Sequence, residues 1–307
     1  MDYFPFNEGE QWGYIGREWN VLIPPIFEEA DYFSDGVAAV LKNGLWGYID
    51  MDGNVIIDYQ FQSAEKFLEG KAWVMAEERF TLLNKKGDAL NQLPKGIADH
   101  IDGLSSNLYR FSREDRFGFL GSDGELCLDA VYDEASSFID GMALVSRAGK
   151  SYFINTEGSV ILENPKYTPV EGFSEGLAQV LFENRQYGYI NMDGEVAIPP
   201  SLRIGSRFSE GRAFFFDPQT MKYGYMNTTG DTLIEAKYDA ALPFISGLAL
   251  VKKGKQVELI NDRGEMVYPL PKESNVDVES YLQGARYFMV NVNGEEKLFN
   301  RELGEMR

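Results

Sequence analysis

The sequence has few of the residues that most often carry catalysis or bind metal ions. Its 307 residues include one histidine, His100, and one cysteine, Cys127. A single cysteine excludes an intrachain disulfide, and the two residues provide too few ligands for a zinc site. They are also weak support for a cysteine–histidine nucleophile pair, because nothing in their spacing links them.

Motifs for phosphate or nucleotide binding are missing as well. The glycines are spread along the chain rather than clustered as in a dinucleotide fingerprint, and no G-x-x-x-x-G-K-[ST] pattern occurs. We therefore predict no cofactor and no enzyme activity. Because carboxylates are abundant, a glycan-active enzyme with an acid–base pair of acidic residues remains the alternative.

Positive charge is scarce. Lysine and arginine number 29 against 48 aspartate and glutamate residues, which gives a net charge of −19. This excess repels phosphate backbones and anionic lipids, so we expect no nucleic acid and no membrane as partner. A basic protein would be attracted, although acidity also keeps a β-rich array soluble. No apolar run approaches about 18 residues, and the start, Met1–Phe6, is no secretory signal. We predict a cytoplasmic protein, provided that no leader has been removed.

The sequence is instead rich in repetition. Trp46-Gly47-Tyr48-Ile49 recurs plainly or in worn form at Trp12–Ile15, Phe80–Leu83, Phe117–Leu120, Tyr152–Ile154, Tyr187–Ile190, Tyr223–Met226 and Val257–Ile260. A second marker, an aromatic residue followed by glycine and alanine as in Phe33–Ala38, keeps the same period of about 35 residues. We predict a single array over residues 1–307, with units starting near 12, 46, 80, 117, 151, 187, 223 and 257 and a partial unit from about 285.

Each unit reads as three short strands. In the second unit these are Val37–Leu41, Leu45–Ile49 and Asn54–Ile57, separated by turn residues at Asn43-Gly44 and Asp50–Gly53. We predict an all-β fold, an array of about eight to nine three-stranded antiparallel meanders joined by connectors of about ten residues. An open, twisting solenoid is favoured. A closed β-propeller is the alternative, because the recurring alanine would suit crowded inner strands.

Residues at regular positions are expected to be structural. Trp46 and its equivalents are predicted to fill the seam between neighbouring units, and Asp50 and Gly53 to serve the turn backbone. Stacked acidic turns such as Asp50 and Asp52 would offer oxygen ligands to calcium. The position of Asp52 holds Lys86 in the next unit, however, so no metal site is predicted.

Three places break the repeat, and one of them is the irregular connector Pro269–Asn275 of the eighth unit. Aligned on the second unit, Trp19 takes the position of Gly53, where a left-handed turn suits tryptophan poorly. The third unit loses the second marker and becomes irregular from Asn91 to Ser106. Repeats drift where nothing demands regularity, but such departures also give a repetitive surface its local identity. We predict partner contacts at Trp19, His100, Asp102 and Tyr109.

These motifs together resemble the WG repeat family of bacterial β-rich proteins. The resemblance rests on Trp46–Asp50, the turn to Gly53, and Phe33–Val40, with connectors such as Ile23–Ala30. It covers nearly the whole chain and weakens in the third and eighth units. The family has no common catalytic residues, and the resemblance implies a mostly non-enzymatic scaffold. Some members resemble immunity proteins encoded beside polymorphic toxins.

From the resemblance and the charge we predict a non-catalytic scaffold that binds and neutralises a basic protein such as a toxin domain. It would act in the manner of a cytoplasmic immunity protein. The alternatives are the glycan-active enzyme and a repeat protein that binds a small molecule or glycan.

Overall fold

The computed structural model describes residues 3–16, 20–162, 166–201, 204–271, 274–276, 278–283, 287–293, 295–301 and 304–306. The chain divides into two compact units. Unit 1 comprises Met1–Phe138, Val145–Lys150 and Thr156–Gly158, and unit 2 comprises Ile139–Leu144, Ser151–Asn155 and Ser159–Arg307. The same small antiparallel sheet recurs through both units, so the predicted all-β array of meander repeats is confirmed.

Unit 1 begins with a three-stranded sheet and continues with three four-stranded sheets, each in sequence order. The strands are β1 (Phe4–Glu8), β2 (Gln11–Ile15) and β3 (Val21–Phe27); β4 (Glu29–Ala30), β5 (Val37–Lys42), β6 (Leu45–Asp50) and β7 (Val55–Phe61); β8 (Ser63–Ala64), β9 (Lys71–Ala76), β10 (Arg79–Asn84) and β11 (Ala89–Gln92); β12 (His100–Ser105), β13 (Leu108–Arg113), β14 (Arg116–Gly121) and β15 (Leu126–Tyr132).

Unit 2 contains four further four-stranded sheets. The strands are β20 (Tyr167–Pro169), β21 (Ala178–Phe182), β22 (Tyr187–Ile190) and β23 (Val196–Ser201); β24 (Ile204–Gly205), β25 (Arg212–Asp217), β26 (Lys222–Asn227) and β27 (Thr232–Tyr238); β28 (Ala240–Ile245), β29 (Leu248–Lys253), β30 (Gln256–Ile260) and β31 (Met266–Pro269); β32 (Ser274–Val276), β33 (Tyr287–Val292), β34 (Glu295–Asn300) and β35 (Glu305–Met306). In chain order, four strands come between β15 and β20: β16 (Glu134–Ala135), β17 (Met142–Arg147), β18 (Lys150–Asn155) and β19 (Val160–Leu162).

Turn chemistry sets the register of each meander. In the sheet β4–β7, Ala38 lies opposite Ile49 and Val40 opposite Gly47. The hairpin between β5 and β6 turns at Asn43 and Gly44, both with positive φ, and the Glu28 carboxylate accepts hydrogen bonds from their two N–H groups. The strand positions therefore follow from local sequence.

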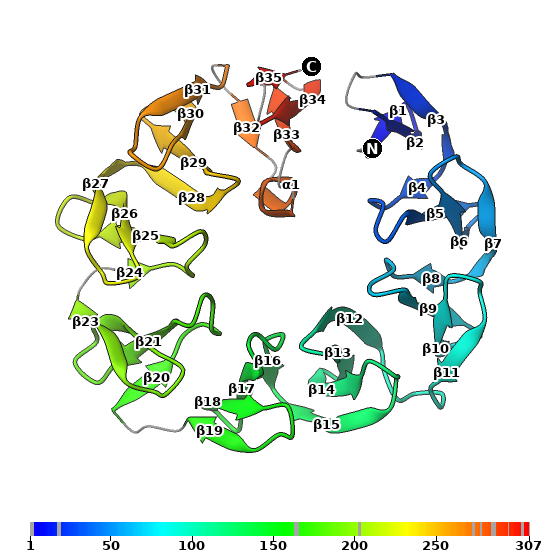
Figure 1. Ribbon diagram of the computed structural model, residues 1–307, viewed down its shortest axis with the longest axis horizontal. Coiled ribbons are helices and arrows are strands. Elements are labelled where there is room, and N and C mark those ends of the chain that lie inside the picture. Colours follow the sequence, from blue (N-terminus) through cyan, green and yellow to red (C-terminus); the bar gives the residue numbers. More distant parts are fainter. Residues whose placement is uncertain are drawn as a thin grey trace. The chain divides into compact units, whose positions relative to one another are not determined.

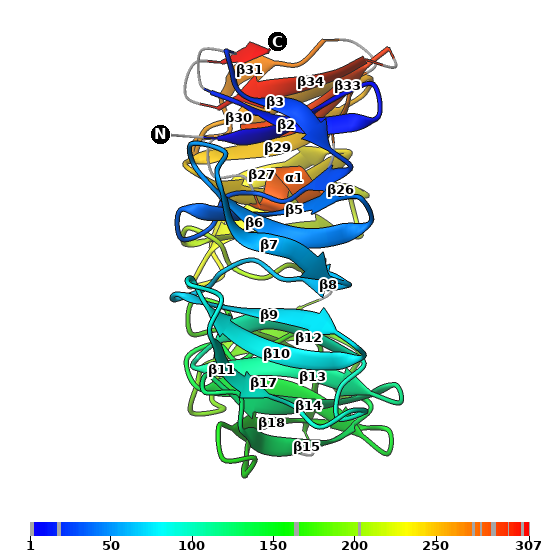
Figure 2. The ribbon, with the colours of Figure 1, turned by 90° about the vertical axis from the view of Figure 1, so that its right-hand side faces the viewer.

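The connector contributes a fourth strand that the sequence did not reveal. After β7, the chain passes to the next sheet and pairs Ser63 and Ala64 of β8 with β9. Figure 1 shows that, within unit 1, the sheets succeed one another along an arc, with β4, β8 and β12 on its inner side and β7, β11 and β15 on its outer side. Figure 2 shows β5–β7 and β9–β11 as successive layers.

A tyrosine and a phenylalanine fill the seam between repeats. The Tyr48 ring is fully buried and packs edge-on against Phe67, with ring centroids 4.8 Å apart. Its hydroxyl donates to the Glu65 carbonyl oxygen at 2.7 Å, which fastens the connector. The corresponding hydroxyls make the same bond to a connector carbonyl: Tyr14 to Asp31, Tyr189 to Ser206 and Tyr225 to Leu242. The main seam residue is thus Tyr48, whereas the predicted Trp46 is half-buried.

The glycine of the first motif is required by a close approach of two backbones. A Cβ at Gly47 would lie 2.8 Å from the Ile57 carbonyl oxygen and 3.0 Å from the Tyr59 nitrogen. Real side chains do not tolerate such contacts with backbone atoms. The glycine therefore lets β6 and β7 twist tightly around each other.

One short helix occurs among the described residues, α1 (Val278–Gln283). It follows β32 near the end of the chain. No helix in the described part of the chain is long and apolar enough to cross a membrane.

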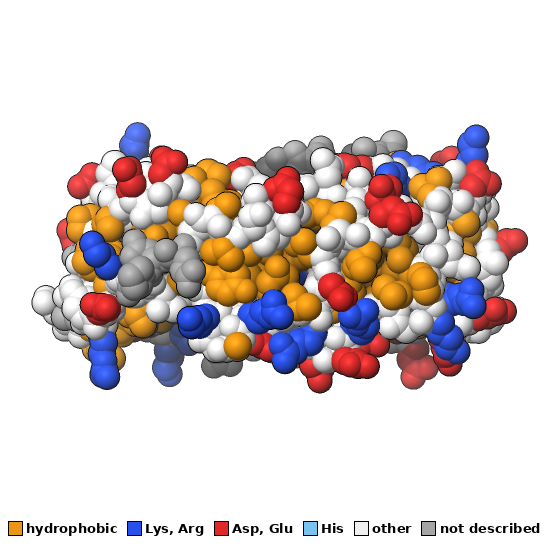
Figure 3. Space-filling view, turned by 90° about the horizontal axis from the view of Figure 1, so that it is seen from below, with side chains coloured by type: hydrophobic (Ala, Val, Ile, Leu, Met, Phe, Trp, Pro, Cys, Tyr) orange, Lys and Arg blue, Asp and Glu red, His pale blue; other side chains and the backbone are white. Residues whose placement is uncertain are grey.

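Apolar side chains such as Val55 and Leu126 are exposed near the start of outer strands. Figure 3 shows hydrophobic side chains gathered in patches along the middle of the face in view, with charged side chains mostly above and below them.

Candidate functional site

The structure gathers three of the four predicted contact residues on one hairpin of unit 1. His100 and Asp102 belong to β12, and Tyr109 belongs to β13, its antiparallel neighbour. Ladder pairing sets Asp102 opposite Arg110 and His100 opposite Ser112. Trp19 lies outside the residues that the structure describes.

The exposed side of this hairpin carries an ion pair. The Arg110 guanidinium approaches Asp102 with Nη2 at 2.8 Å and Nε at 3.2 Å from Oδ2. Arg110 also lies over the Phe117 ring, 5.3 Å from its centroid, and donates to the Ala135 carbonyl oxygen. These contacts fix the Arg110 and Asp102 side chains in place, while His100 beside them is exposed. The pair is partly solvated, so its contribution to stability is modest.

Tyr109 lies beneath this surface. Its side chain is 3% exposed and packs edge-on against Trp73 of β9, with ring centroids 5.8 Å apart. Burial raises the pKa of Tyr109 to about 12. Its role as a contact residue stays a prediction, and in this position the ring supports the surface from the interior.

An exchange of large and small residues explains the unusual pair. Tyr109 lies opposite Leu120 in the ladder position that Ala38 occupies opposite Ile49. Trp73 lies opposite Leu82, just as Ala39 lies opposite Tyr48. In the sheet β8–β11 the aromatic ring is therefore moved from β10 to β9, while the sheet β12–β15 keeps Phe119 on β14 and gains Tyr109 on β13. The sequence signal of this rearrangement was the loss of the aromatic–glycine–alanine marker in the third unit.

A small cavity remains next to the two rings. Its volume is about 20 Å³, and the residues around it include Glu65, Lys66, Trp73, Ile101, Asp102 and Tyr109. They come from the connector to β9, from β9 itself and from β12 and β13. The cavity thus lies between two neighbouring sheets of unit 1.

Two other carboxylates of unit 1 act on Glu65, which lines this cavity, and we call Asp31, Glu65 and Asp102 the acidic row. Asp31 and Glu65 hold equivalent connector positions, because the carbonyls of both accept a tyrosine hydroxyl. Burial raises the pKa of Glu65, His100 opposes the shift, and Asp31 and Asp102 add to it. The Glu65 carboxylate accepts no hydrogen bond and forms no ion pair within the described part of the chain. No sequence signal pointed to Glu65, because it lies in a connector of regular spacing.

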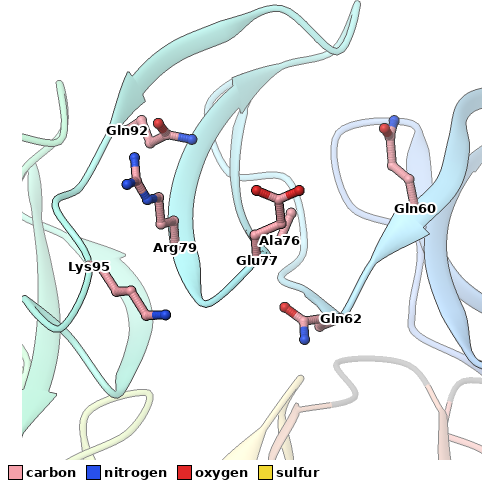
Figure 4. A pocket seen from close by; sticks show the side chains of 7 residues that line it. All are labelled: Gln60, Gln62, Ala76, Glu77, Arg79, Gln92 and Lys95. Atoms are coloured by element: carbon pink, nitrogen blue, oxygen red, sulfur yellow. The ribbon is translucent and has the colours of Figure 1, made fainter.

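A polar groove lies elsewhere in unit 1, around the hairpin between β9 and β10. Its volume is about 740 Å³, and its polar side chains are Gln60, Gln62, Glu77, Arg79, Gln92 and Lys95. Figure 4 shows Arg79 and Gln92 close together on one side, with Gln60 and Gln62 on the other side of Glu77. Amide groups offer both donors and acceptors, so the groove can hydrogen-bond a polar ligand.

The described residues contain no group of three or more histidine, cysteine, aspartate or glutamate side chains placed to hold a metal ion. The turn carboxylate considered for calcium is already engaged. Asp50 Oδ1 accepts hydrogen bonds from the N–H groups of Asp52 and Asn54 at 2.9 and 2.8 Å. Cys127 is a free, exposed thiol.

Comparison with known families gives a match over most of the chain. A model described as a WG containing repeat matches residues 12–46, 46–78, 117–150, 153–185, 187–216 and 223–256. The matched stretches leave out 79–116, which includes β12 and β13. The hairpin β12–β13 of the candidate site therefore lies where the chain departs from the family pattern, whereas Asp31, Glu65 and Trp73 lie within matched stretches. No curated protein matches the sequence.

Solved structures resemble the fold with little sequence in common. A crystal structure of the eukaryotic initiation factor aligns with a TM-score of 0.64 at 10% identity over 97% of this chain and 93% of that chain. AztD from Citrobacter koseri gives 0.43 at 10% identity over 91% and 92%. BamB from Moraxella catarrhalis gives 0.40 at 11% identity over 97% and 93%. At these identities the likeness concerns the fold alone, and of the three only the first is close enough to support it.

Proposed function

Because the chain belongs to the family of proteins with WG-containing repeats, we propose that it is a non-catalytic scaffold that binds another protein through unit 1. The observation that carries the proposal is the Glu65 carboxylate, which is half-buried, has its pKa raised by burial against the opposing effect of His100 and Lys66, and makes no hydrogen bond or ion pair among the described residues. A charge in this setting costs free energy until a cation reaches it. A lysine or arginine of a partner would supply that cation.

The chemistry of the surroundings favours a basic partner. Arg110 holds Asp102, which lines the cavity together with Glu65, and the exposed His100 is near enough to act on the pKa of Glu65, so a polar rim adjoins this carboxylate. The net charge of −19 would speed the approach of a positively charged protein and orient it before contact. Binding at this site is expected to weaken as salt is added, because screening reduces both effects.

The finer proposal is that binding neutralises a toxic partner, in the manner of a cytoplasmic bacterial immunity protein. Its support is the family resemblance, the acidity and the polar rim beside Glu65. A repeat scaffold suits this role because a rigid array of sheets can cover a partner's active surface without chemistry of its own.

The test is affinity capture from the source cells with the intact chain and two matched variants. Glu65→Gln keeps the shape of the side chain and removes its charge, while Glu10→Gln removes an exposed charge outside the acidic row. We expect Glu65→Gln to lower the yield of a specific partner about tenfold, or about 1.4 kcal/mol, and Glu10→Gln to leave it unchanged. Equal capture by all three proteins would refute the assigned site.

The immunity role needs a separate measurement. The captured partner is expressed alone and together with this chain, and growth of the host is recorded. Growth arrest by the partner, relieved by the chain but not by Glu65→Gln, is the expected result. A harmless partner would remove the immunity role and leave a binding scaffold.

The polar groove supports a second candidate function, the binding of a polar small molecule or glycan. A volume of about 740 Å³ lies within the range of small-molecule sites, and Arg79 forms no ion pair among the described residues. Titration with a panel of soluble glycans, using Arg79→Gln as the control variant, tests it. Identical responses from both proteins would exclude this groove as the site.

A further inference from the structure

Two polar atoms in the interior of unit 1 have no hydrogen-bond partner among the described residues. They are the indole nitrogen of Trp73 and the hydroxyl oxygen of Tyr109. The two side chains are only 2% and 3% exposed, so bulk water does not reach them. Buried donors are nearly always satisfied in native proteins, because leaving one unpaired is costly. A partner for both atoms is therefore expected.

The cavity that Trp73 and Tyr109 line limits the size of that partner. Its volume is about 20 Å³. A buried water needs roughly 10–15 Å³ and two to four polar neighbours. The space admits one water molecule and excludes any larger ligand.

The groups around the cavity also select the charge of the occupant. The Trp73 N–H can only donate, and it would oppose a cation. Charges of both signs surround the cavity, because Lys66 lines it together with Glu65 and Asp102, and Asp102 is paired with Arg110, so an anion gains no net attraction. A neutral molecule that accepts from Trp73 and either accepts from or donates to Tyr109 satisfies all of them.

We propose that this cavity is a binding site for one ordered water molecule, held by the Trp73 indole N–H and the Tyr109 hydroxyl. The water links two sheets, because Trp73 lies in β9 and Tyr109 lies in β13. It takes the place of the direct bond that Tyr48 makes to the next connector, since Leu82 occupies the equivalent position of the third repeat and has no hydroxyl. The irregular repeat thus keeps a polar link between neighbouring sheets by another route.

The direct test is a high-resolution crystal structure of the intact chain. We expect an electron-density peak in the cavity within about 3.2 Å of both Trp73 Nε1 and Tyr109 Oη. A well-ordered cavity with no peak, or a peak that reaches neither atom, would overturn the proposal.

The thermal stability of Tyr109→Phe tests the same proposal by the sign of its effect. If the hydroxyl binds water, its removal breaks a hydrogen bond, and the Tm is expected to fall by about 1–3 °C. If the hydroxyl is truly unpaired, its removal relieves a desolvation penalty and the Tm rises. The control is Tyr59→Phe, since Tyr59 is only half-buried and its hydroxyl makes no hydrogen bond among the described residues. A Tyr109→Phe protein as stable as the control, or more stable, contradicts the water site.

Discussion

Tyr48→Phe removes one of the tyrosine hydrogen bonds that join a connector to the repeat before it. The substitution removes one oxygen and leaves the ring, which is 0% exposed, packed against Phe67. It deletes the 2.7 Å bond to the Glu65 carbonyl oxygen and leaves that carbonyl without its partner. A net hydrogen bond contributes about 0.5–1.5 kcal/mol, and an orphaned buried group adds to the loss. We expect Tyr48→Phe to lower the free energy of unfolding by about 1–2 kcal/mol.

The assay is urea unfolding at neutral pH, with the slope of the transition compared between proteins. A lower midpoint at an unchanged slope would identify a loss of stability rather than a change in the unfolded state. Tyr59→Phe, on the outer strand of the same sheet, serves as the control and is expected to change stability by less than about 0.5 kcal/mol. If Tyr48→Phe and Tyr59→Phe have the same urea midpoint, the hydrogen bond of the Tyr48 hydroxyl does not stabilise the packing of neighbouring repeats.

Three further predictions concern the array. Gly47→Val should lower the free energy of unfolding by about 3 kcal/mol or prevent folding, because the new side chain would meet the Ile57 and Tyr59 backbone. The control is Leu45→Val, which changes an exposed residue of the same strand. Similar melting temperatures for the two variants would contradict the close approach of the backbones at Gly47. Alkaline pH should unfold the chain, because burial raises the pKa of Tyr48 and its equivalents above the unfolded value of about 10. Their contribution is complete below that pH and is lost as pH rises beyond it, so a stability that stays flat up to pH 12 would contradict the assignment. The open solenoid remains a prediction for small-angle scattering, and a maximum dimension close to that of a compact sphere would remove it.

The strands were predictable because their signals are local. Asn43-Gly44 and Asp50–Gly53 dictate tight turns on their own, and strands of regular length lie between them. The fourth strand was not predictable, since β8 is two residues long and its pairing depends on where the next sheet lies. Trp46 and Tyr48 point to the same face of one strand. Sequence alone could not show that Tyr48 would be the more deeply buried of the two.

The candidate site was predictable only in part. The broken marker led to His100, Asp102 and Tyr109, which the fold brings onto one hairpin. Glu65 was missed because its connector follows the regular pattern, and its importance arises from neighbours that come from other repeats. Trp73 could have been found by comparing repeats position by position, since it stands where another repeat has an alanine.

The most direct test of protein binding at unit 1 is photo-crosslinking in living cells. A photoreactive phenylalanine analogue is incorporated at position 100, beside Glu65, and in a second protein at position 58, an exposed site on outer strand β7. We predict one discrete crosslinked protein from position 100, absent from position 58 and lost when Glu65→Gln is added. No crosslink from position 100, or the same crosslink from both positions, would contradict a partner site at the acidic row.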